Sequence, residues 1–108
     1  MEARLKAKIL VSAIVRACGT ALIPAYVVRR GDADSGAVLV VALAPGGTAT
    51  VFQVVFDGEG ARLWQAVRAG VAAAEADAFA ARQAEIDEDL WIVEVEAPEG
   101  WTPAAVTG

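Results

Sequence analysis

An uncharged, mostly apolar stretch occupies residues 36–56 and consists of two β-rich runs around a turn. The first run, residues 36–43, is apolar throughout, which indicates a strand covered on both faces. The second, residues 48–56, alternates only partly because Thr and Gln interrupt it, as in a less buried neighbouring strand. The sequence Ala44-Pro45-Gly46-Gly47 between them is typical of a turn, so the pattern predicts a β-hairpin at the centre of a sheet. Four of its residues are expected in the core: Leu39, Val41, Val51 and Phe52.

Residues 3–18 have the period of an amphipathic helix. Lys8, Ser12 and Arg16 recur at every fourth position and form one polar stripe, while apolar residues occupy much of the remaining surface. Gly19 suits the end of this helix. We therefore expect the helix to pack on the sheet with its polar stripe toward solvent.

A second helix, rich in alanine, is predicted over residues 71–86. At helical spacing, Gln83 falls on the same apolar side as Phe79 and Ile86. A buried amide without partners is costly, so Gln83 is expected to be buried and hydrogen-bonded. Arg82 lies at the margin of that side and is expected to reach one of three nearby acids: Asp87, Asp89 or Glu94.

Shorter segments complete the set of elements. Residues 25–30 predict the first strand, and residues 90–96 predict the last one. Residues 31–36, rich in Gly, Asp and Ser, are typical of a hairpin loop. Residues 61–68 fit either a fourth strand or the lead-in to the second helix.

The order of elements predicts an α+β fold, and the tight turns favour antiparallel pairing. We expect an N-terminal helix, an antiparallel β-meander of three to four strands, a second helix and a final strand that joins the sheet, with both helices on one face. Residues 1–96 are expected to form a single domain. Residues 97–108 are expected to form an irregular C-terminal tail.

The composition favours association and the charge is unevenly distributed. Hydrophobic residues make up 56% of the 108 residues, which is more apolar surface than so small a body can easily hide. Residues 1–30 carry six basic residues and one acid, whereas residues 31–108 carry three basic residues and thirteen acids. We expect the two parts to meet in the fold and neutralise each other. The alternative is a basic face for a nucleic acid or an acidic lipid.

The chain has no histidine and one cysteine, Cys18. This excludes an internal disulfide, a Cys/His zinc site and the Ser-His-Asp and Cys-His mechanisms within one chain. The basic and apolar start before Cys18 mimics a lipoprotein secretion signal, but Arg16 interrupts its apolar part. We therefore expect a cytoplasmic protein that keeps its first helix, with Cys18 buried.

Charged and aromatic side chains supply a candidate ligand site. Asp32 and Asp34 bring two carboxylates close together, but the spacing is not that of an EF-hand, so no metal site is predicted. Arginines with an aromatic ring suit an anion joined to a flat ring. The alternative is that these arginines form structural ion pairs with neighbouring acids. The candidate ligand-binding residues are Arg29, Arg30, Asp32, Asp34, Arg82, Gln83 and Trp91.

Three segments of the chain are distinctive when taken in order: Arg4-Leu5-Lys6-Ala7-Lys8-Ile9, then Val28-Arg29-Arg30-Gly31-Asp32-Ala33-Asp34-Ser35-Gly36-Ala37-Val38-Leu39-Val40, then Ala81-Arg82-Gln83 followed by Asp87-Glu88-Asp89-Leu90-Trp91-Ile92-Val93-Glu94-Val95-Glu96. Together they resemble a family of short bacterial proteins catalogued as a domain of unknown function, the one numbered fourteen ninety-one. The resemblance covers almost the whole chain except the tail. Members usually have Pro where this chain has Glu88. The resemblance implies a bacterial cytoplasmic protein with a single domain, and it implies nothing about chemistry because the family brings no established activity.

The sequence favours a small non-catalytic interaction module, expected to be a homodimer. It shows no nucleophile–base pair, and its adjacent glycines lack the context and the Lys of a phosphate-binding loop. An enzyme is therefore not favoured, and neither a cofactor nor a membrane association is expected. The alternative is a small-molecule or nucleotide-binding protein that uses Arg and carboxylate side chains. Nucleic acid is not an expected partner, because the basic residues are not interleaved with aromatic ones.

Overall fold

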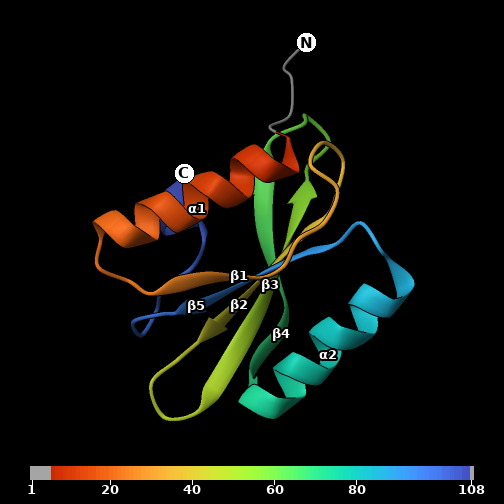
Figure 1. The fold of residues 1–108 in the computed structure, drawn as a ribbon. Coiled ribbons are helices and arrows are strands. Elements are labelled where there is room, and N and C mark those ends of the chain that lie inside the picture. Colours follow the sequence, from red (N-terminus) through yellow and green to blue (C-terminus); the bar gives the residue numbers. More distant parts are fainter. Residues whose placement is uncertain (1–5, 108) are drawn as a thin grey trace.

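The computed structural model describes residues 6–107, in which a five-stranded sheet is flanked by two long helices (Figure 1). The elements in chain order are α1 (Ala7–Thr20), β1 (Ala25–Arg29), β2 (Val38–Leu43), β3 (Thr48–Phe56), β4 (Arg62–Ala72), α2 (Ala73–Ile86), β5 (Trp91–Glu96) and α3 (Ala104–Thr107). The strand order is β1-β5-β2-β3-β4, so the predicted hairpin lies at the centre and β2 is the middle strand. All four predicted core residues of the hairpin are buried.

The sheet is mixed, which corrects the predicted antiparallel meander. β5 enters between β1 and β2, antiparallel to β1 and parallel to β2. β1 and β2 are therefore not neighbours, and residues 31–36 are not a hairpin loop but a connection that passes the start of β5. Turn signals are local, whereas the pairing of β5 joins segments far apart in the chain, so the sequence pattern could not reveal this order.

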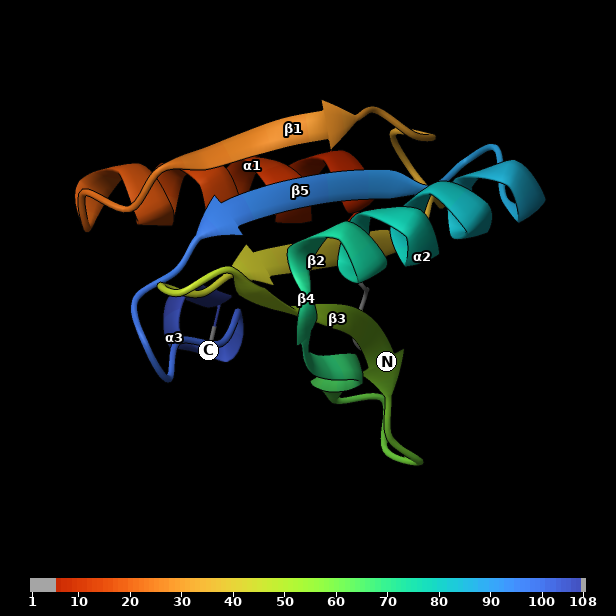
Figure 2. The same ribbon diagram turned by 90° about the horizontal axis from the view of Figure 1, so that it is seen from below.

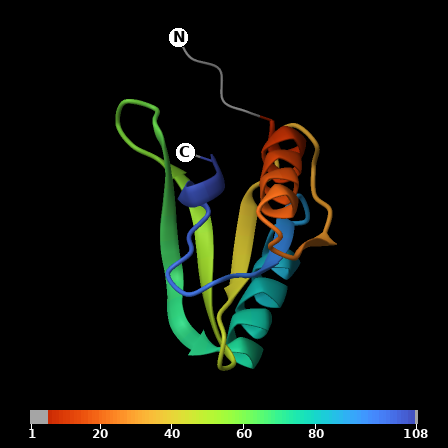
Figure 3. The same ribbon diagram turned by 90° about the vertical axis from the view of Figure 1, so that its left-hand side faces the viewer.

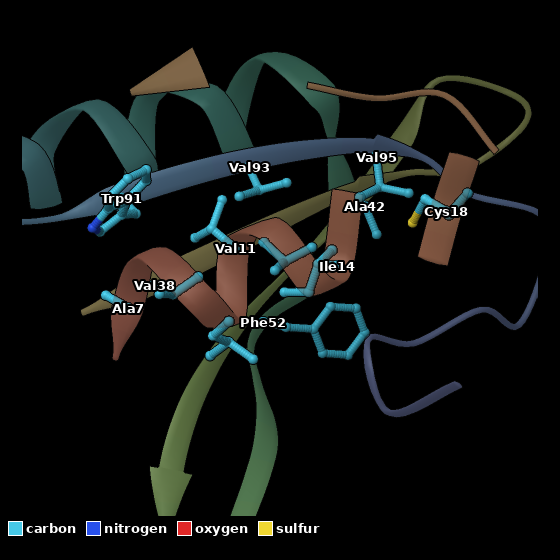
Figure 4. Packing of buried hydrophobic residues seen from close by; sticks show 13 residues of the cluster. Ala7, Val11, Ile14, Cys18, Val38, Ala42, Phe52, Trp91, Val93 and Val95 are labelled. Carbon is cyan, nitrogen blue, oxygen red and sulfur yellow. The ribbon is translucent and has the colours of Figure 1, made fainter. Parts of the chain in front are cut away.

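The two long helices cover opposite faces of the sheet, where the sequence pattern suggested one shared face (Figure 2). Side chains of β2 point alternately to the two faces. Val40 packs in a core beneath α1 that includes Ile14, and the next residue, Val41, packs in a second core that includes Phe79 of α2. Figure 4 shows the first core, with side chains of α1 directed toward those of β2 and β5. The fully apolar run of β2 is thus explained by burial on both faces.

The ambiguous residues 61–68 belong to β4, the outer strand next to β3. Two register irregularities interrupt the pairing of β3 with β4. After β5 the chain ends in the short helix α3, which lies beside α1 on the same side as the first core (Figure 3). Trp64 Nε1 donates to Thr107 Oγ1 at 3.0 Å, and Trp101 packs against the first core. The segment expected to be an irregular tail therefore covers part of the sheet.

The last turn of α2 contradicts the prediction for Gln83. The buried residues of this helix are Ala76, Phe79 and Ala80. Gln83 is only partly buried, and its side chain makes no hydrogen bond within residues 6–107. Arg82 is exposed without an ion pair in the same range, and Ile86 is 80% exposed. Full burial ends before the helix does, so a helical pattern extended over its whole length assigns too many residues to the core.

Candidate functional site

A turn built on Asp32 shapes the connection between β1 and β2. Its carboxylate oxygen Oδ2 accepts hydrogen bonds from the backbone N–H of Ser35 (2.9 Å), from the Ser35 hydroxyl (3.0 Å) and from the backbone N–H of Asp34 (3.1 Å). These bonds favour the ionised form and lower the pKa of Asp32 below its ordinary value. The carboxylate that the sequence offered as a possible ligand group is thus engaged in holding the turn.

Two glycines allow this connection to lie directly against the start of β5. A Cβ on Gly31 or on Gly36 would collide with the carbonyl oxygen of Asp89. The same oxygen accepts a hydrogen bond from the Asp32 backbone N–H at 3.0 Å. The close approach of two backbones therefore requires glycine at both positions.

Trp91 joins the connection to the core beneath α1. Its ring is 2% exposed, and its Nε1 donates to the Asp32 carbonyl oxygen at 2.7 Å. The guanidinium of Arg30 lies over the ring, with Cζ 5.4 Å from the centroid, which is a cation–π distance. Figure 4 shows the ring at the same end of the core as Ala7. The ring is almost fully buried, with the Arg30 guanidinium over it, and it forms part of the lining of a surface hollow.

Arg29 and Asp34 also have partners within the protein. Arg29 Nη1 donates to the carbonyl oxygens of Leu90 (2.6 Å) and Glu88 (3.1 Å), which fixes the residues leading into β5. Asp34 forms an ion pair with Lys6 at 3.6 Å, and both side chains are exposed. An exposed pair of this kind contributes little to stability. Arg29 is thus bound to backbone carbonyls and not, as the alternative reading expected, to acids.

The structure gathers five of the seven candidate residues around the β1–β2 connection and the start of β5: Arg29, Arg30, Asp32, Asp34 and Trp91. Arg82 and Gln83 lie on α2, across the sheet, and form no hydrogen bond or ion pair with this group through their side chains. Of the arginines in the group, Arg30 lines a hollow on the surface.

That hollow is a groove of about 280 Å³ between α1 and β1. The stripe on α1 forms one side of it, and these residues are exposed as predicted: Lys8, Ser12 and Arg16. Successive members of the stripe are about 6 Å apart along the helix axis. Val27 and Arg30 form the other side, and the more deeply buried residues of the lining are Val11, Val15 and Trp91. The sequence pattern reveals the stripe and predicts a solvated face, but nothing local indicates that Arg30 lies opposite it.

The basic residues around the groove are not neutralised by neighbouring acids. Lys6 with Asp34 is the ion pair formed within residues 6–107. Lys8, Arg16 and Arg30 form none in that range, and the groove lining contains no acid. The expected mutual neutralisation therefore does not occur through ion pairs, and a local positive surface persists on a chain whose net charge is −5.

A reactive thiol, a metal site and a membrane-spanning helix have less support than a binding groove. Cys18 is buried and free, and burial raises the pKa of its thiol, which disfavours the reactive thiolate. In the described part of the chain, no three His, Cys, Asp or Glu side chains come together as metal ligands would. In the same part, no helix has the length and apolar character needed to cross a membrane.

The chain matches the family model DUF1491, described as a protein of unknown function, over residues 5–105, and it belongs to this family. It is similar to a crystal structure of a DUF1491 family protein from Caulobacter crescentus CB15, with 38% identity over 87% of this chain and 89% of that one, at a TM-score of 0.80. An NMR structure of a DUF1491 family protein from the same organism has 37% identity over 94% of both chains and a TM-score of 0.81. The solution structure of protein Atu0922 from A. tumefaciens has 26% identity over 97% of this chain and 94% of that one, with a TM-score of 0.80. No curated protein matches the chain.

Proposed function

We propose that this member of the DUF1491 family is a non-catalytic interaction module that works as a homodimer, with the copies joined through β1. One observation carries the proposal. Eight large apolar side chains are exposed among the described residues, and four of them lie close together in the chain. These four are Leu22 (90% exposed), Tyr26 (51%), Val27 (39%) and Val28 (58%). Such a concentration on one surface segment is typical of an interface.

β1 is also an edge of the sheet. Within residues 6–107 it pairs with β5 on one side and with no strand on the other. An open edge offers unpaired N–H and C=O groups, and monomeric proteins protect it with bulges or charges. β1 has a register irregularity between Val27 and Arg29, and it ends in an arginine, but residues 25–28 carry no charge. Most of the strand is therefore unprotected against pairing.

A second copy is the partner that fits this edge most simply. Two identical edge strands related by a two-fold axis pair antiparallel, so that each satisfies the free backbone groups of the other. Such pairing would join the two sheets into one and would bring the exposed side chains of β1 against their counterparts. The high proportion of hydrophobic residues in the chain, 56%, supports the same conclusion.

The experiment is a measurement of mass in solution by light scattering over a range of concentrations. We expect a mass of two 11.1 kDa chains for the native sequence. Val28→Lys should yield monomers, because a lysine on an edge strand opposes pairing. Leu63→Lys is the matched control, since Leu63 is 49% exposed on β4, the opposite edge, and its substitution should leave the dimer intact. A single-chain mass for the native protein at every concentration, or dissociation by Leu63→Lys alone, would refute the role of β1.

The alternative, a small-molecule or nucleotide-binding protein that uses Arg and carboxylate side chains, is favoured by a different observation. Arg30 is held over Trp91 beside two further cations that lack ion pairs in the described residues. The carboxylates proposed for this function are less suitable, because Asp32 holds its own turn and Asp34 pairs with Lys6. A ligand site at this position therefore has to be cationic.

A further inference from the structure

We propose that the groove between α1 and β1 binds the phosphate monoester of a small apolar or aromatic group. The phosphate would be held by Lys8, Arg16 and Arg30 with the hydroxyl of Ser12, and the organic group would lie on the apolar floor. The inference develops the cationic alternative above and does not require the proposed dimer, although Val27 of the edge strand β1 also lines the groove. All of the lining residues come from one chain.

The charge of the lining carries the first part of the argument. Three cations, two from α1 and one from the residue that follows β1, border one small hollow. No acid lines it, and none of the three has an ion pair within residues 6–107. Like charges placed close together repel one another, which costs stability unless an anion joins them. A phosphate monoester carries nearly two negative charges at neutral pH and offers three acceptor oxygens, which suits donors on the two sides of one groove.

Arg30 is already positioned for this role. Its guanidinium is held over the Trp91 ring, and that ring is fixed by burial and by its hydrogen bond to the Asp32 carbonyl oxygen. The turn on Asp32 is in turn held by Ser35. A group that is ordered before binding loses little conformational entropy when the ligand arrives. The contacts among the candidate residues thus hold the guanidinium of Arg30 beside the groove.

The floor and the volume define the class of ligand. Val11, Val15 and Trp91 offer an apolar floor, and Val27 adds an apolar side below the charged rim. A volume of about 280 Å³ is at the lower end of the range for small-molecule sites, so it suits a ligand with a single ring or a short chain. An apolar floor under a basic rim favours an amphipathic anion over a bare inorganic ion.

The larger hollow on the other side of α1, about 1170 Å³, is a poorer candidate. It shares the stripe of α1, but Asp34 lines it as well and its remaining walls are mostly small apolar residues from α1, α3 and the connection. Arg30 does not reach it. The third cation of the larger hollow, Lys6, is paired with Asp34, so this hollow has two cations without an ion pair in the described residues and the groove on the β1 side has three.

The test is an NMR titration of the full-length protein with phenyl phosphate at low ionic strength, followed in ¹⁵N–¹H spectra. We expect saturable shifts in α1 and in β1, and affinity about tenfold lower for inorganic phosphate, which cannot use the floor. Arg16→Gln should weaken the binding of phenyl phosphate about tenfold, because it removes one charge-assisted contact. Added salt should also weaken the binding of phenyl phosphate to the native protein, because it screens the charges.

Arg82→Gln is the matched control, since Arg82 is also an exposed arginine on a helix without an ion pair in the described residues, and it lies on the other face. It changes the net charge equally and should leave the affinity unchanged. Equal weakening by the two variants would show diffuse charge attraction and overturn the site. Equal affinity for phenyl phosphate and inorganic phosphate would overturn the assigned ligand class. Dilution to monomer should not alter the affinity, so failure of the dimer and failure of the groove are separate results.

Discussion

The α1 layer and the α2 layer cover the same sheet by different means. α1 buries five side chains, among them three large aliphatic ones, whereas α2 buries two alanines and Phe79. Both helices begin without a side-chain cap and use backbone carbonyls of neighbouring loops instead. Lys8 N–H donates to the Ala33 oxygen at 2.9 Å, and Ala73 N–H donates to the Gly47 oxygen at 3.1 Å.

The outward faces of the two layers differ in charge. The described part of α1 carries only basic charged residues, whereas α2 carries Glu75, Asp77 and Glu85 against Arg82. The layer that buries more side chains therefore also presents the uncompensated positive charge. A surface on a helix anchored by more buried side chains loses less freedom on binding, which favours the α1 side as the site of recognition.

The largest expected effect is the loss of a core side chain from α1. Ile14 is fully buried, so Ile14→Ala should lower the free energy of unfolding by about 2–5 kcal/mol. Ile86→Ala removes the same atoms from the 80% exposed end of α2 and should change it by less than about 0.5 kcal/mol. Denaturant titration of both variants measures the difference. Comparable losses would mean that the end of α2 is packed in solution and that the contrast between the layers is wrong.

The next effect concerns the connection that supports the α1 layer. Gly31→Ala should destabilise the protein by about 1–3 kcal/mol, because the added Cβ meets the Asp89 carbonyl and either the connection or β5 must move. Gly19→Ala is the control, since a Cβ there meets nothing within 4 Å and alanine is the better helix former. Gly19→Ala should be neutral or slightly stabilising in thermal unfolding. A neutral Gly31→Ala would show that the close approach of the two backbones is relaxed in solution.

Sequence reasoning found the elements more reliably than their arrangement. The central hairpin, the polar stripe of α1 and the buried Cys18 are all confirmed, because each depends on a local signal: apolar runs around a turn, a helical period, and a small residue within the helix. The place of β5 between β1 and β2 could not be found in this way. This position of β5 also explains Gly31 and Gly36, which are needed for close contact with a distant segment of the chain and not for a tight turn.

The candidate site was predicted only in part for the same reason. Arg30 and Trp91 were singled out, but their stacking depends on β1 and β5 being neighbours. Arg29 was expected to bind a ligand or an acid, and it binds carbonyl groups that sequence patterns do not display. Gln83 was misplaced because an alanine-rich helix has a weakly defined apolar side, so its spacing does not determine which face is buried.

A smaller effect should appear in the pH dependence of stability on the α1 side. The pKa of Asp32 is lowered by its bonds to Ser35 and Asp34, so its ionised form is favoured by folding. The stabilisation is present above the ordinary pKa and is lost as the pH falls through the lower pKa of the folded state. Asp32→Asn should therefore melt below the native protein at neutral pH and converge with it in acid. A constant difference at every pH would mean that the charge of Asp32 does not matter.

The smallest effect on stability is expected for Glu94 on the α2 side, and its dependence on pH is opposite to that of Asp32. Partial burial raises the pKa of Glu94, and Asp77 and Glu96 raise it further. Folding therefore disfavours its ionised form, so the native protein loses stability as the pH rises from the ordinary pKa of 4.5 through the raised one. Glu94→Gln should melt slightly above the native protein at neutral pH, and the gain should disappear in acid, where the native side chain is protonated as well.

Glu85→Gln, at an exposed position of α2, serves as the control for the loss of one negative charge. If it raises the melting temperature as much as Glu94→Gln does, the gain reflects the overall negative charge of the chain and not the position of Glu94. If Glu94→Gln melts lower at neutral pH, the carboxylate makes a favourable contact. The acidic side of the sheet would then be stabilised by its charges in the same way as the turn on Asp32.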